Sequence, residues 1–129
     1  MTSPVPEERR KFFRVNFKRP LEYRSFDDKN RTHATCQNVS QTGILFQTEH
    51  APQMSSILWM GLDIRTLGIC KEIEKRALIF NEGLVGKVVR VEEDSTKDNV
   101  YDVGVCFITQ DQRNTSEVQK ILEGLSKAA

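Results

Sequence analysis

The chain has 129 residues, with 19 Lys and Arg against 18 Asp and Glu, and a formal net charge of +1. This length fits one domain with a core of its own. The near-neutral charge excludes a polycation, so any attraction to nucleic acid or to a membrane surface needs a local patch. No apolar run approaches the roughly 18–20 residues that span a bilayer. The N-terminus has no signal-peptide pattern, so we expect a cytoplasmic protein without membrane insertion.

The cysteines and histidines do not predict a metal site. Cys36, Cys70 and Cys106 are far apart, and no C-x-x-C pair occurs. His33 and His50 do not stand at ligand spacing from any of them. We therefore expect no metal, and reduced thiols that are buried or half-buried.

The first residues differ in character from those that follow. Residues 1–8, with two prolines, are expected to form a flexible lead, and residues 9–127 to form the domain. A period-2 pattern then predicts a first strand, with Pro20 at a bend or edge position. Its apolar residues are Val15, Phe17, Leu21 and Tyr23.

Turn and strand signals alternate through the next third of the chain. Residues 27–30 (DDKN) predict a turn, residues 31–40 a polar second strand, and residues 44–49 a third strand after a short loop. Residues 55–64 carry apolar side chains on both faces, which predicts a strand that is covered on both sides.

Residues 65–82 allow two interpretations. One is a short helix around residues 71–75 followed by a strand at 77–80, and the other is an extended β-excursion.

The last third predicts two more strands and a helix. Residues 83–94 and 100–108 are strand-like, and residues 95–99 form a turn between them. Several strands at this spacing predict an antiparallel barrel or sandwich. From residue 114 onward, capping residues precede an amphipathic helix that we expect to pack on the barrel. Its apolar stripe consists of Val118, Ile121, Leu122 and Leu125.

A basic run precedes the first strand. Between Arg9 and Arg19 there are six positive residues and no negative one, and R-R-x-x-x-R occurs at Arg9, Arg10 and Arg14. Taken alone, such a run usually forms a solvated charged face.

A second short motif, N-V-S-Q-T-G, lies between the second and third predicted strands. Asn38 and Ser40 are alternate residues, so on an extended backbone their side chains point to one face. Gly43 lets another group approach the backbone closely. Taken alone, these residues are typical of an ordinary turn.

The two motifs together resemble the PilZ domain family, in which R-x-x-x-R precedes the first strand and [D/N]-x-S-x-x-G follows the second. The resemblance covers roughly residues 7–125 and includes G-I-L-F after the turn and Y-D-V-G-V-C-F near the end. It implies an all-β fold with a C-terminal helix, built as a six-stranded antiparallel β-barrel that binds cyclic di-GMP. The charged stretch 65–82 departs from the pattern of a small member.

The resemblance also implies how the ligand is held. The arginine fork fits phosphate oxygens or guanine O6 and N7, while Asn38 Oδ1 and the Ser40 hydroxyl are expected to accept the guanine N1–H and 2-amino donors. Arg9, directly before R-x-x-x-R, favours an intercalated cyclic di-GMP dimer. The arginines would lie on an N-terminal arm that folds over the ligand and signals to an effector protein. The implied contact residues are Arg9, Arg10, Arg14, Asn38, Ser40 and Gly43.

Two other functions stay open. One is a PilZ-like module that binds only protein, and the other, less favoured, is a barrel that binds single-stranded nucleic acid through backbone charge and aromatic stacking. An enzyme is not expected, because Ser40 lacks a G-x-S-x-G elbow and no phosphate-cradling glycine loop is present. We expect no cofactor, and the downstream process stays open.

Overall fold

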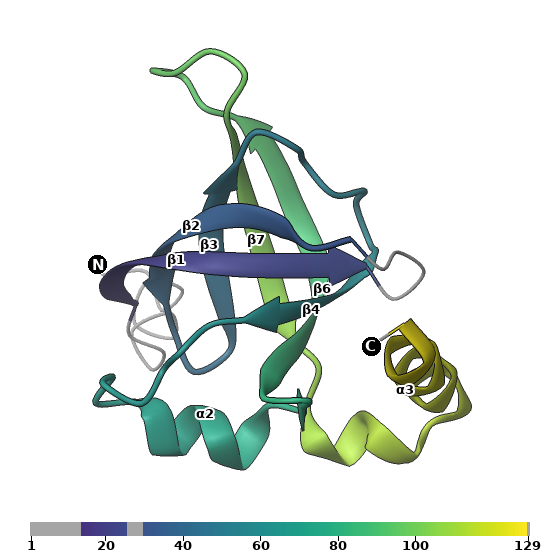
Figure 1. Ribbon diagram of the computed structural model, residues 1–129. Coiled ribbons are helices and arrows are strands. Elements are labelled where there is room, and N and C mark those ends of the chain that lie inside the picture. Colours follow the sequence, from purple (N-terminus) through teal and green to yellow (C-terminus); the bar gives the residue numbers. More distant parts are fainter. Residues whose placement is uncertain (1–13, 26–29, 129) are drawn as a thin grey trace, which may run out of the picture.

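The computed structural model describes residues 14–25 and 30–128, and these residues form a closed barrel (Figure 1). The strand order is β4-β1-β2-β3-β7-β6, and pairing of β4 with β6 closes the antiparallel ring. A short extra strand, β5, pairs with the start of β6. The strands are β1 (Val15–Ser25), β2 (Thr32–Val39), β3 (Gly43–Thr48), β4 (Ile57–Gly61), β5 (Ile79–Phe80), β6 (Gly83–Glu93) and β7 (Tyr101–Phe107). The six-stranded barrel implied by the resemblance is confirmed.

Alternation of side chains explains the barrel interior. In β1, Phe17, Leu21 and Tyr23 are buried, as the period-2 pattern predicts. Pro20 lies where β1 pairs only with β2, because pairing with β4 begins at Glu22. A residue without an N–H is tolerated at such an edge-like position.

Strand β4 is buried on both faces, as predicted. Leu58 and Met60 belong to the core inside the barrel, whereas Ile57 and Trp59 belong to a second apolar cluster. The second cluster holds residues of the C-terminal helix together with Val85 of β6. The C-terminal helix covers the outer face of β4 and β6, which explains why β4 is apolar on both faces.

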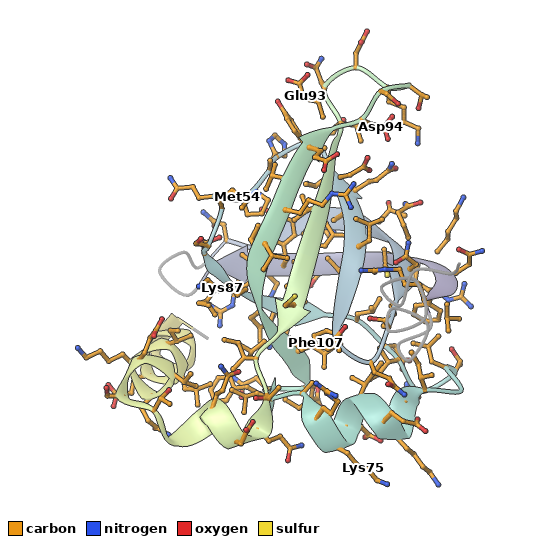
Figure 2. All side chains as sticks on the ribbon, turned by 180° about the vertical axis from the view of Figure 1, so that it is seen from behind. Met54, Lys75, Lys87, Glu93, Asp94 and Phe107 are labelled. Atoms are coloured by element: carbon orange, nitrogen blue, oxygen red, sulfur yellow. The ribbon has the colours of Figure 1, made fainter. Side chains whose placement is uncertain are left out.

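Residues 65–82 follow the first of the two interpretations. Helix α2 (Cys70–Arg76) is followed by a bridge from Ala77 to Thr109 and then by β5. Ile73 is fully buried in the barrel core, so α2 covers one end of the barrel, at the bottom of Figure 1. Lys75 points away from the barrel (Figure 2).

The chain ends in a 3-10 helix, η1 (Gln110–Asn114), and helix α3 (Ser116–Ala128). The Thr115 hydroxyl accepts a hydrogen bond from the Val118 N–H, which caps α3. Val118, Ile121 and Leu122 are buried against the barrel, as predicted, while the side chain of Leu125 lies outside the described part of the structure.

Two features that bear on function are absent from the described residues. No helix among them is long and apolar enough to cross a membrane. Within the same ranges, no group of three His, Cys, Asp or Glu side chains could hold a metal ion.

Candidate ligand-binding site

The sheet register brings the two sequence motifs together. The start of β1 pairs with the end of β2, with Val15 opposite Val39 and Asn16 opposite Asn38. Arg14, which directly precedes β1, therefore lies beside the loop that connects β2 to β3. Antiparallel pairing thus makes neighbours of two segments that are distant in the chain.

A direct hydrogen bond joins the motifs. Arg14 Nη1 donates to Asn38 Oδ1 at 2.8 Å, across a sequence separation of 24 residues. Arg14 is exposed and Asn38 is half-buried, so both side chains border on solvent. The other two predicted arginines, Arg9 and Arg10, lie outside the described residues, as do the lead predicted at residues 1–8 and residues 27–29 of the turn predicted at 27–30.

Ser40 is placed differently from the expectation. The residue is only 2% exposed, and its Oγ accepts hydrogen bonds from the N–H groups of Thr42 and Gly43, each at 3.2 Å. The alternation that would align it with Asn38 does not extend to Ser40, because β2 ends at Val39 and Ser40 belongs to the loop. Ser40 therefore stabilises the conformation of the loop through hydrogen bonds within it.

The backbone that closely approaches Gly43 belongs to a strand of the barrel. A Cβ at this position would lie 2.2 Å from the Val105 carbonyl oxygen, in the facing strand β7. The Ser40 N–H also donates to the Gly43 carbonyl at 2.8 Å, which closes the loop. Gly43 is thus required where β3 begins, and the space beside it is filled by β7.

Strand register places one further side chain next to Gly43 and a second one strand farther from it. Gly43 lies opposite Cys106 of β7, and Cys106 lies opposite Lys87 of β6. Both side chains are exposed, so the expectation of buried or half-buried thiols is wrong for Cys106. By contrast, burial raises the pKa of the Cys36 thiol to about 12. Alternation along the two strands is the sequence signal that places Lys87 and Cys106 on the outer face.

The other end of the barrel is stabilised by different contacts. Figure 2 shows Glu93 and Asp94 at the tip of the hairpin formed by β6 and β7. Gln47 Nε2 donates to carboxylate oxygens of Asp94 at 2.8 Å and of Asp102 at 2.9 Å, and so ties this tip to β3. This polar network involves none of the motif residues.

Comparison with known proteins identifies the family. No curated protein matches the chain. The chain matches the PilZ domain over residues 8–124, a range that includes both motifs and nearly the whole sequence. PilZ domains are binding modules, and the family is one of cyclic di-GMP receptors. With its closed barrel, its C-terminal helix and its two motifs joined by the bond from Arg14 to Asn38, this chain belongs to the PilZ domain family.

Proposed function

We propose that this protein is a cytoplasmic receptor for cyclic di-GMP, which binds between the N-terminal arginines and the loop from β2 to β3. The observation that supports this most is the 2.8 Å hydrogen bond from Arg14 to Asn38. It places a guanidinium from the first motif directly at the second motif. One residue of each motif, Arg14 and Asn38, thus lies at the proposed site.

The chemistry of cyclic di-GMP fits this surface. Guanidinium groups bind phosphate oxygens and guanine O6 and N7 in bidentate fashion, which a lysine ammonium cannot do. A good pair between arginine and guanine contributes about 1–3 kcal/mol where it has been characterised in DNA complexes. Contacts from Arg9, Arg10 and Arg14 could therefore supply much of a micromolar affinity, which corresponds to about −8 kcal/mol.

Ser40 and Gly43 act in this proposal as positioning residues. Because the Ser40 hydroxyl accepts two backbone N–H groups of the loop, it fixes the backbone that carries Asn38. Gly43 permits the approach of β3 to β7 that anchors the same loop. Loss of either residue would weaken binding by moving Asn38.

Signalling is proposed to run through the N-terminal arm. Arg9 and Arg10 would fold onto the ligand, ordering would cost part of the binding energy, and the ordered arm would offer a new surface to an effector protein. Arg9 would further favour an intercalated cyclic di-GMP dimer over a single ligand. The protein would thus act as an adaptor without catalytic activity.

Calorimetric titration tests this proposal. Cyclic di-GMP is titrated beside GTP, cyclic di-AMP and a single-stranded oligonucleotide, and only cyclic di-GMP is expected to bind with micromolar or better affinity. A stoichiometry of two ligands per chain supports the intercalated dimer. Steeply salt-dependent oligonucleotide binding without dinucleotide binding would instead indicate a nucleic-acid-binding barrel.

Matched arginine variants locate the site. Arg14→Lys keeps the charge but loses the fork, and should weaken binding about tenfold or more. Arg31, an exposed arginine just before β2, lies at the opposite end of that strand from Asn38. Arg31→Lys should therefore bind like the wild type. Equal affinities for the two variants would place the ligand elsewhere.

Relaxation of backbone amides tests the arm. The amides of residues 5–14 should become more rigid when cyclic di-GMP is added. Unchanged rigidity in the bound state would contradict the proposed rearrangement, even if the ligand binds.

A further inference from the structure

A cleft opens where strands β1 and β4 part. The two strands pair over residues 22–25 of β1, and β4 ends at Gly61. Before Glu22, β1 pairs only with β2 among the described residues. A cleft of about 860 Å³ lies here, lined by residues 20–22 of β1, by α2 and by the hairpin of β5 and β6. Its volume is typical of a binding pocket.

The floor of the cleft is apolar. Its buried lining residues include Leu21, Leu62, Ile64 and Leu84. At the rim, Ile79 of β5 is 40% exposed, which makes it one of three large apolar side chains that are exposed among the described residues. Apolar surface that is open to solvent beside a cleft is typical of a site where another chain docks.

The rim of the cleft is acidic. Each of the two arginines in its lining already pairs with a carboxylate. Two further carboxylates of the lining, Glu74 of α2 and Glu82 of the hairpin, form no ion pair with any residue that the structure describes. Burial and the negative charge of Glu74 raise the pKa of the Cys70 thiol at the same rim. The cleft therefore favours an occupant that is both apolar and basic.

A basic and aromatic segment fits this cleft. Residues 9–13 of the chain, R-R-K-F-F, carry three cations followed by two phenylalanines and lie outside the described residues. Phe12 and Phe13 are within two residues of Arg14, which corresponds to about 7 Å of extended chain. Pro20, where the cleft meets β1, lies about 20 Å beyond Arg14 along the strand. The two phenylalanines of a second copy are free of this restriction.

We propose that, without cyclic di-GMP, residues 9–13 of a second copy dock in this cleft. The phenylalanines cover the apolar floor, and the cations lie beside Glu74 and Glu82. Because each chain offers one arm and one cleft, the exchange forms a dimer with two-fold symmetry. On the basis of the proposed function, cyclic di-GMP binds the arginines of the same arm and therefore separates the two chains.

The dimer is expected to be weak. Its four phenylalanines bury about 600–1,000 Å² of aromatic surface. Specific and stable interfaces bury about 1,200–2,000 Å² in total, and smaller ones are typical of transient complexes. The dimer should therefore dissociate on dilution. It should also dissociate at high salt, because salt screens the attraction between the arm and the cleft.

Sedimentation velocity of the full chain tests the proposal. Without ligand, the sedimentation coefficient should rise from that of a monomer to that of a dimer as the protein concentration is raised. Glu74→Gln combined with Glu82→Gln should raise the dissociation constant of the dimer about fivefold or more. Glu49→Gln combined with Glu93→Gln is the matched control and should leave it unchanged. Both control residues are exposed and lie outside the cleft, and Glu93 lies at the far end of the barrel from α2 (Figure 2).

Charge reversal identifies the occupant. Arg9→Glu with Arg10→Glu on the arm should abolish association, and so should Glu74→Lys with Glu82→Lys on the cleft, because like charges then meet. A mixture of the two reversed variants should associate again, because every arm in the mixed dimer meets a cleft of opposite charge. An arm that docks in the cleft of its own chain, or a dimer through another surface, would give no such recovery and would overturn the proposal.

The outcomes also separate this inference from the proposed function. A wild type that stays monomeric at every concentration, or a glutamine variant that associates like its control, would overturn the dimer and leave the receptor function intact. A dimer that persists while cyclic di-GMP is bound would overturn the competition for one arm. Failure of cyclic di-GMP to bind, with a dimer that depends on Glu74 and Glu82, would overturn the proposed function and leave the docking in place.

Discussion

Gly43→Ala tests the assignment of Gly43 to barrel packing. The added Cβ would lie 2.2 Å from the Val105 carbonyl oxygen and 3.2 Å from the carbonyl carbon. Ordinary contact begins at 3.4 Å, so the backbones of β3 and β7 would have to separate by about 1.2 Å. Neither partner atom belongs to a flexible side chain, so the strands cannot relax cheaply.

The expected magnitude follows from this overlap. Overpacking against a fixed backbone costs about 1–3 kcal/mol. Next to Gly43, the Phe107 N–H donates to the Thr42 carbonyl at 2.8 Å, and weakening that bond would cost about another 1 kcal/mol. We expect Gly43→Ala to lower the free energy of unfolding by about 2–4 kcal/mol.

Chemical denaturation followed by fluorescence measures the change. Trp59 is the single tryptophan and is 6% exposed, so its emission should report unfolding of the barrel. Gly68→Ala is the control, because a Cβ there meets nothing within 4 Å and its φ is not positive. That variant should be unchanged or more stable by up to about 1 kcal/mol. Equal stability of Gly43→Ala and Gly68→Ala would refute the packing argument.

Three further predictions concern other parts of the chain. Thr115→Ala should destabilise the protein by about 1 kcal/mol through loss of the α3 cap, whereas Thr115→Ser should not; equal denaturation midpoints would contradict the cap. A maleimide should label exposed Cys106 in the folded protein and buried Cys36 only after unfolding, and cyclic di-GMP should slow labelling of Cys106 if the ligand covers the neighbouring loop. Hydrogen bonds from Arg65 lower the pKa of the Asp63 carboxyl to about 2, so any stabilisation by this pair is present above the ordinary pKa of 3.8 and lost as the pH falls through 2. An NMR titration of Asp63 with a midpoint near its ordinary pKa would contradict the pairing.

Most of the barrel could be predicted from residue patterns, because strict alternation has a direct structural cause. In β7, Val103, Val105 and Phe107 are buried inside the barrel, as the sequence indicates. Helix α2 could not be assigned with the same clarity. It has only seven residues with one buried side chain, Ile73, so it leaves almost no helical periodicity.

Among the predicted contact residues, the neighbourhood of Arg14 and Asn38 is seen in the structure, whereas the packing of Ser40 and Gly43 was not expected. The motif residues Arg14 and Asn38 do meet, while the expected alignment of Asn38 with Ser40 depended on unbroken alternation. Strand β2 ends at Val39, one residue before Ser40, so the alternation does not extend to Ser40, and a strand end cannot be located to one residue from sequence patterns. The reason for Gly43 likewise depends on strand β7, which is distant in sequence and cannot be inferred from the motif alone.

An NMR titration of the labelled protein with cyclic di-GMP tests the central claim most directly, because it reports binding and its location together. The account predicts saturable shifts that are largest at the amides of Arg14, Asn38 and Gly43, and small at Arg31 and along α3. Absence of any shift at millimolar ligand, or a set of shifts confined to α3, would contradict the claim that cyclic di-GMP binds where the two motifs meet.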